Sequence, residues 1–188
     1  MKHLSIICLT CLLLACSDQT PPEPDNPFTE TVSINIPQPL ETDGVVTDFT
    51  MLSDNAGPTT ISIAPDGTIW YTLSSGNGIG KMQPDGTGMV EYPIPTPDSS
   101  PRIIALGSDG NMWFSEHNSG KIGRITPEGA ITEFDLSSPD SQPRAIALGR
   151  DGNIWIGMFA ASRIGRITPE GVVTEFDIPT PDSGPRAL

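Results

Sequence analysis

One sequence unit recurs along this chain at a nearly constant interval, and it limits what the chain can fold into. The clearest copies are Pro101 to Gly129 and Pro143 to Gly171, which both begin with Pro-Arg and end with Ile-Thr-Pro-Glu-Gly. Three tryptophans, Trp70, Trp113 and Trp155, follow the same interval. A period of about 40–45 residues, with four short strands in each unit, is typical of the blades of a β-propeller.

Each unit is predicted to contain four antiparallel strands. In the copy that begins at Pro143, these are placed at 144–148, 153–156, 163–167 and 172–176. Asp-Gly pairs such as Asp151-Gly152 mark a hairpin, because Gly adopts the positive φ of a tight turn. Calcium binding by these aspartates is the alternative, and the turn is the favoured interpretation. The tryptophans are expected to pack between blades, and Gly123 to let a neighbouring sheet approach closely.

The number of repeats predicts an all-β, open arrangement. Three complete units lie at 58–92, 101–134 and 143–176, another starts at 185, and 44–49 is predicted to be a lone fourth strand. Propellers close with typically four to eight blades. Residues 44–188 are therefore expected to form a partial propeller, an open arc of about three blades, as the N-terminal part of a longer protein. The strand at 44–49 would then complete the last blade of the ring.

Residues 1–15 are typical of an export signal. A basic start precedes the apolar run Leu4 to Leu14, which is too short to span a bilayer. The sequence Leu13-Leu14-Ala15-Cys16 resembles a bacterial lipoprotein cleavage box, which implies cleavage before Cys16 and lipidation of its sulfur. The alternative is an ordinary secretory signal with an incidental cysteine. Cys8 and Cys11 would be removed with the signal, so no free thiol would remain.

A lipid anchor would place the protein in the cell envelope. Residues 16–43 are rich in proline and acids, and are predicted to be an extended tether between membrane and domain. Ser17 follows the cysteine, where aspartate usually retains lipoproteins at the inner membrane. In a cell with two membranes, the expected location is therefore the outer membrane, facing the periplasm.

The charge of the chain argues against nucleic acid as a partner. Lys and Arg total 10, Asp and Glu total 23, and the net charge is −13. A nucleic-acid-binding domain needs a basic surface to neutralise phosphates. The acidic residues are interpreted as keeping the domain soluble.

The candidate ligand-binding residues are three arginines that follow the strand-opening prolines. Arg102, Arg144 and Arg186 are expected on one face of the propeller, near its channel, together with Glu116 and His117. Converging guanidinium groups bind an anion or a carbonyl, unless each is paired with an acid or carbonyl of a neighbouring blade.

Glu116 and His117 are the weaker candidates, for catalysis. His117 is a candidate general base or ligand, or else a solvated loop residue. No metal-ligand spacing and no Ser-His-Asp set is present, so the sequence itself indicates no cofactor.

With this repeat in view, the chain resembles the virginiamycin B lyase (streptogramin lyase) family. The similarity extends from Val45 to Leu188, and it is carried by the motifs Trp113 to His117, Ile131 to Phe134, Ser141 to Ile146, Gly152 to Trp155 and Arg163 to Pro169. The resemblance implies a seven-bladed propeller, and the intact protein is expected to be a monomer. It also implies magnesium-dependent lyases that open the ring of type B streptogramins by elimination across the threonyl ester.

The resemblance leaves the question of catalysis open. The catalytic histidines of the family directly follow the strand-opening proline in later blades, and the matching positions here hold Arg102, Arg144 and Arg186. The alternative is a non-catalytic propeller that binds a peptide, glycan or protein at its channel face. A gluconolactonase-like metal hydrolase is less favoured, because it needs acidic residues where this chain has arginines.

Overall fold

The structure, a computed structural model, describes residues 3–5 and 46–188. The predicted signal peptide, Cys16 and the tether fall outside the described residues, apart from the short strand β1 (His3–Ser5). The described residues form an all-β structure, and they contain no helix long and apolar enough to cross a lipid bilayer.

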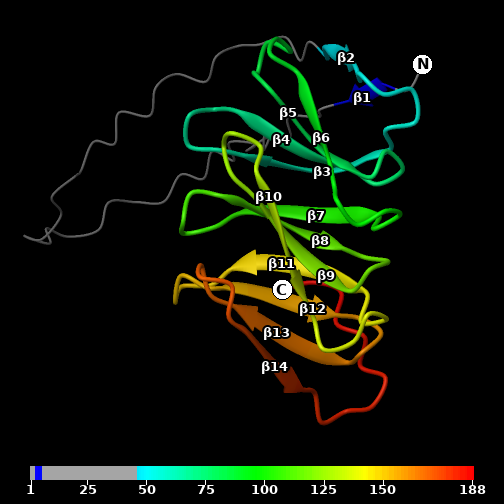
Figure 1. Cartoon of the computed structure of the whole chain (residues 1–188), viewed down its shortest axis with the longest axis vertical. Coiled ribbons are helices and arrows are strands. Elements are labelled where there is room, and N and C mark those ends of the chain that lie inside the picture. The colour runs from blue at the N-terminus through cyan, green and yellow to red at the C-terminus, as the bar shows by residue number, and fades with distance from the viewer. Residues whose placement is uncertain (1–2, 6–45) are drawn as a thin grey trace, which may run out of the picture. The chain divides into compact units, whose positions relative to one another are not determined.

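Three four-stranded antiparallel sheets follow one another in chain order (Figure 1). Blade 1 consists of β3 (Pro58–Ile63), β4 (Ile69–Leu73), β5 (Gly78–Met82) and β6 (Val90–Pro93). Blade 2 consists of β7 (Pro101–Leu106), β8 (Met112–Glu116), β9 (Lys121–Ile125) and β10 (Ile131–Asp135). Blade 3 consists of β11 (Pro143–Leu148), β12 (Ile154–Met158), β13 (Arg163–Ile167) and β14 (Val173–Asp177).

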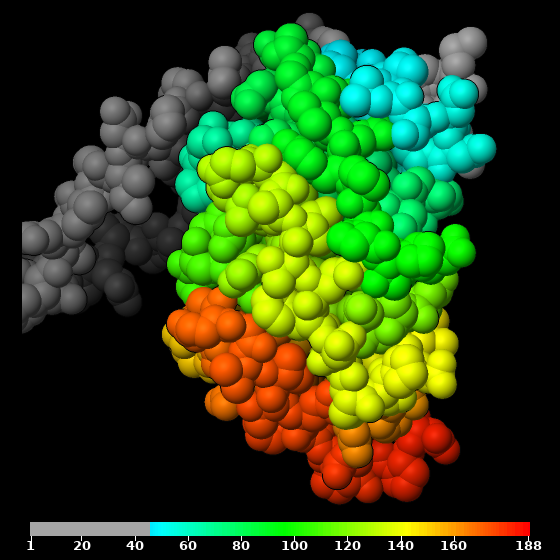
Figure 2. All heavy atoms as spheres, in the orientation of Figure 1, coloured from blue at the N-terminus to red at the C-terminus, as the bar shows by residue number. Residues whose placement is uncertain are grey.

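The arrangement of the sheets is that of propeller blades. Each sheet is a meander in sequence order, and the first strands β3, β7 and β11 contact one another in turn. In the space-filling view, the three blades pack directly against one another (Figure 2). The predicted all-β, open arrangement of four-stranded blades is confirmed, with strand bounds that lie close to the predicted ones.

Strand β2 (Asp48–Thr50) precedes the first blade and pairs with β1. A Cβ atom on Gly86 would collide with the ring of Phe49, as one on Gly129 would with Tyr92 and one on Gly171 with Phe134. Each of these glycines has a positive φ and lies in the turn between the third and fourth strands of the next blade. Phe49 therefore contacts blade 1 in the same way as Tyr92 of blade 1 contacts blade 2 and Phe134 of blade 2 contacts blade 3.

Two of the three tryptophans, Trp70 and Trp113, lie where blades meet, as predicted. Trp70 belongs to an apolar cluster shared by blades 1 and 2, and Trp113 to one shared by blades 2 and 3. Both side chains are buried, whereas Trp155 in blade 3 is half-buried. Because blade-to-blade packing removes large aromatic surfaces from water, these contacts stabilise the blades against one another.

Gly123 has a different role from the predicted one. It pairs across the sheet with Phe114, and a Cβ atom at this position would collide with the Phe114 ring. Gly80 accommodates Tyr71 in the same way in blade 1. The expectation that a neighbouring sheet approaches Gly123 was wrong, since the space is filled by an aromatic ring of the same sheet.

Candidate functional site

The three predicted arginines stand at equivalent places in the fold. Arg102 and Arg144 are the second residues of β7 and β11, and both are half-buried. Arg186 is exposed and follows Pro185, in a segment that forms no strand in the structure. A Cβ atom on Gly157 would lie 3.2 Å from the Pro185 carbonyl oxygen, so this segment passes along β12. The arginines thus occupy the same repeat position in successive units of the sequence.

Two ring-bearing residues alternate with these arginines. His117 follows β8 directly and Phe159 follows β12 directly, so the two also share one repeat position. Their backbone N–H groups donate to equivalent carbonyls, of Ser100 at 3.3 Å and of Gln142 at 3.1 Å. These five residues follow one another from blade to blade, and we call them the arginine row: Arg102, His117, Arg144, Phe159 and Arg186.

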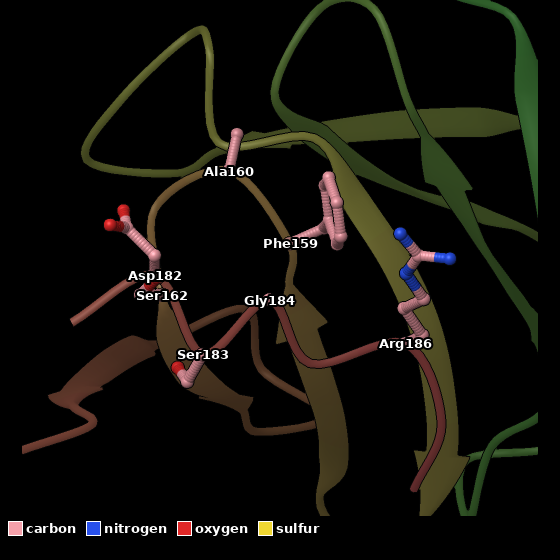
Figure 3. A pocket seen from close by; sticks show the side chains of 7 residues that line it. All are labelled: Phe159, Ala160, Ser162, Asp182, Ser183, Gly184 and Arg186. Carbon is pink, nitrogen blue, oxygen red and sulfur yellow. The ribbon is translucent and has the colours of Figure 1, made fainter. Parts of the chain in front are cut away.

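Phe159 contacts the guanidinium groups on both sides of it in the arginine row. The Cζ atom of Arg144 lies 4.1 Å from the centre of the Phe159 ring, and that of Arg186 lies 4.7 Å from it. Figure 3 shows the Phe159 ring beside the Arg186 guanidinium, at the edge of a hollow of about 370 Å³. Asp182 and Ser162 also line this hollow, and Asp182 forms no ion pair with Arg186. Cation–π contact at this distance holds the two cations against the ring.

His117 is buried, with 5% of its surface exposed, so the interpretation as a solvated loop residue was wrong. Burial lowers the pKa of the imidazole below its usual value, and the nearby Arg102 and Arg144 lower it further. Its Nδ1 atom is buried and has no hydrogen-bond partner among the described residues. His117 is consequently neutral at pH 7, and both Arg102 and Arg144 are near enough to act on its charge.

Glu116 is fully buried at the end of β8, next to Glu133 and Lys121. Its Oε2 atom accepts a hydrogen bond from the Ser119 hydroxyl at 3.0 Å, while Oε1 is buried without a partner. Burial, followed by repulsion from Glu133, raises the pKa of Glu116 to about 7. A carboxyl group with no exposed surface cannot reach a substrate, so Glu116 does not serve as a base in this arrangement.

The described residues do not fit the magnesium ion that the resemblance implies. They contain no group of three or more acidic, His or Cys side chains able to hold a metal. In the acidic pair of Glu116 and Glu133, Glu133 Oε1 accepts a hydrogen bond from the Thr96 N–H at 3.0 Å. The Lys121 ammonium lies 4.0 Å from its other oxygen. Magnesium needs an octahedral set of oxygens, and an adjacent ammonium opposes a cation there.

Two residues of the site, Phe159 and Glu133, are not among the candidates predicted from the sequence. Phe159 shares its repeat position with His117, so aligning the two copies would have found it. Glu133 has equivalents in Glu91 and Glu175 at the same position of the repeat, so the sequence gives no reason to assign it a separate role. No signal within one copy of the repeat distinguishes it from them.

The Asp-Gly pairs are turns, as predicted. Gly110 and Gly152 have φ of 77° and 78°. Each preceding aspartate accepts a hydrogen bond from the backbone N–H two positions later in the chain. Their carboxylates therefore stabilise the hairpins.

Comparison with known proteins identifies the family. The model of the "Virginiamycin B lyase family" matches residues 22–188. The chain belongs to the virginiamycin B lyase family. Virginiamycin B lyase of Bordetella parapertussis is 42% identical over 38 residues, which are 20% of this chain and 12% of that protein.

Solved structures extend the similarity over most of the described residues. Virginiamycin B lyase from Staphylococcus aureus is 41% identical, with a TM-score of 0.75, over 78% of this chain and 50% of that one. A catalytically inactive variant of the same enzyme, with quinupristin, matches equally well. A streptogramin B lyase structure is 40% identical, with a TM-score of 0.74, over 77% and 48%. The chain thus spans about half the length of these solved relatives.

Proposed function

We propose that this protein is a carbon–oxygen lyase that opens the ring of type B streptogramins by elimination across the threonyl ester. The observation that carries the proposal is the similarity to the Staphylococcus aureus lyase over nearly all of the described blades. Support also comes from the inactive variant of that enzyme with quinupristin. The fold alone would not indicate an activity, because propellers serve many functions.

In this proposal, the described blades bind substrate and a residue outside them removes the proton. A guanidinium remains protonated at neutral pH and cannot act as a base. Glu116 and His117 are both buried. The arginine row can instead hold carbonyl or carboxylate groups of a cyclic depsipeptide at the channel face.

The test compares this chain with the product of its complete reading frame, each incubated with a type B streptogramin and magnesium. Elimination opens the ring without changing its mass, whereas hydrolysis adds the mass of one water. We expect the complete product to give a linear peptide of unchanged mass, and residues 1–188 alone to give none. If the complete product opens no ring, or adds water, the proposal is wrong and a binding propeller is favoured.

We further propose that the protein is anchored to the cell envelope through a lipid on Cys16, which lies outside the described residues. The support is the sequence Leu13 to Cys16 directly after an apolar run. Metabolic labelling with a palmitate analogue and membrane fractionation test it in the Cys16→Ser variant. Cys8→Ser and Cys11→Ser are matched controls that should keep label and membrane association. A Cys16→Ser protein that is still labelled and processed to the same size would overturn the proposal.

A further inference from the structure

The arginine row carries positive charge without any acidic partner. Its three arginines form no ion pair and no side-chain hydrogen bond among the described residues. Arg124, in contrast, pairs with Asp109, and Arg163 with Glu175 and Asp177. The chain has 23 acidic residues for 10 basic ones, so acids are plentiful. Cations left unpaired and close together in an acidic protein indicate a site whose counter-charge comes from a ligand.

Two buried polar atoms in the row also lack partners. These are Nε of Arg144 and Nδ1 of His117. Nε of Arg124 and Arg166, outside the row, also lacks a partner, so the distinctive atom is that of His117, which is 5% exposed. Buried polar groups are nearly always hydrogen-bonded, and each exception needs a reason. Burial and the two flanking guanidinium groups keep His117 neutral, so the imidazole adds no further positive charge. The site therefore groups three guanidinium charges with two flat rings.

This arrangement suits one class of ligand better than others. Guanidinium groups bind carboxylates through paired N–H donors, and Phe159 keeps Arg144 and Arg186 close to a flat apolar ring. A ligand with a free carboxylate matches the unpaired guanidinium groups, whereas the Phe159 ring is already covered by Arg144 and Arg186. A neutral cyclic peptide offers carbonyl groups only, and these form weaker hydrogen bonds with a charged donor than a carboxylate does.

The proposed reaction generates such a carboxylate. In the elimination, the α-hydrogen leaves as a proton to a base and its electron pair forms the carbon–carbon double bond. The alkyl–oxygen bond of the ester then breaks, and its electron pair stays on the carboxylate oxygen. One substrate molecule thus gives one linear peptide with one new negative charge, and no other reactant is consumed.

We infer that the arginine row is a binding site for the free carboxylate of a linear peptide. The inference rests on the proposed function for the origin of this peptide, namely ring opening. Arg144 is the central residue, because it lies between His117 and Phe159 and is half-buried where Arg186 is exposed. The row would hold the carboxylate as it forms and would set the affinity for the product.

Isothermal titration calorimetry on the chain tests the inference. The probes are a short linear peptide ending in phenylalanine with a free carboxylate, its C-terminal amide, and an intact cyclic depsipeptide. We expect the acid to bind about tenfold more tightly than the amide and the cyclic form. Arg144→Gln should remove this difference. Arg150→Gln, which deletes an equal charge from an exposed hairpin, should preserve it.

Several results would overturn the inference. Equal affinity for acid and amide is one, and an acid preference that survives Arg144→Gln is another. Benzoate bound as tightly as the peptide acid would show a general anion site instead. If Arg144→Gln does not fold, Arg186→Gln at an exposed position makes the same test. If the complete protein opens no ring but the Arg144-dependent preference remains, the proposed reaction fails and the carboxylate site stands.

Discussion

The chemical difference between blades 2 and 3 is greatest at the ends of their second strands, β8 and β12. The two blades share strand order, pairing and turns. Blade 2 ends this strand with Glu116 and continues with His117, whereas blade 3 has Met158 and Phe159 in the same places. Glu116 and Met158 are both fully buried. The shared residues therefore account for the fold, while the divergent pair gives each blade its own chemistry on one face.

The largest expected effect tests the packing that both blades share. Trp113 is 1% exposed between blades 2 and 3, whereas Trp155 is half-buried. Trp113→Ala should lower the free energy of unfolding by about 3–5 kcal/mol, because it leaves a large cavity. Trp155→Ala should lower the free energy of unfolding by clearly less. Urea denaturation followed by circular dichroism measures both, and equal losses would contradict the view that the inter-blade core stabilises the arc.

The next prediction exchanges the buried residues of the two blades. Glu116→Met puts the blade 3 residue into blade 2, and it should raise the free energy of unfolding at pH 8 by up to about 3 kcal/mol. The reason is the burial of a carboxyl whose Oε1 atom has no partner. The reciprocal Met158→Glu should destabilise blade 3. Thermal unfolding of both variants beside the unaltered protein measures the changes.

The pH dependence of this effect follows from the pKa of Glu116, which is about 7 in the folded protein against 4.5 ordinarily. Between these pH values the unfolded chain binds fewer protons, so stability falls as the pH rises and levels off above about 7. Glu116→Met should therefore have its largest advantage at pH 8 and lose most of it at pH 4. An advantage that is the same at both pH values would mean that ionisation of Glu116 has no part in it.

The repeat predicted the fold well because strand pairing and turns are local. Each Asp-Gly pair and each alternating run falls within a short stretch of chain, and the strands of the structure lie close to the expected bounds. Burial of His117 and Glu116 was not predictable in this way, since it depends on side chains of other strands and of the next blade. The role of Gly123 was misread for a related reason, because its neighbour Phe114 is identified only by the cross-strand register.

The smallest expected effect concerns a hydrogen bond that connects two blades, called the tie below. Arg124 Nη1 donates to the Pro169 carbonyl of blade 3 at 2.7 Å, as Lys81 Nζ in blade 1 donates to Pro127 of blade 2. Arg166 holds the equivalent place in blade 3, and its side chain forms no hydrogen bond among the described residues. Arg124→Met should therefore cost about 1–2 kcal/mol of stability, since the hydrogen bond to Pro169 and the 3.8 Å ion pair with Asp109 are both lost. The aliphatic part of the side chain still covers Trp113.

Arg166→Met is the matched control for this tie, because it removes the same charge from the same register next to Trp155. It should change the free energy of unfolding by less than about 0.5 kcal/mol. Hydrogen exchange adds a local readout: Arg124→Met should speed exchange in the turn at 168–171, which holds Pro169, more than Arg166→Met does. If both variants lose the same stability, the cost comes from the cation over the aromatic pair within each blade, and the bond to Pro169 contributes nothing to holding the blades together.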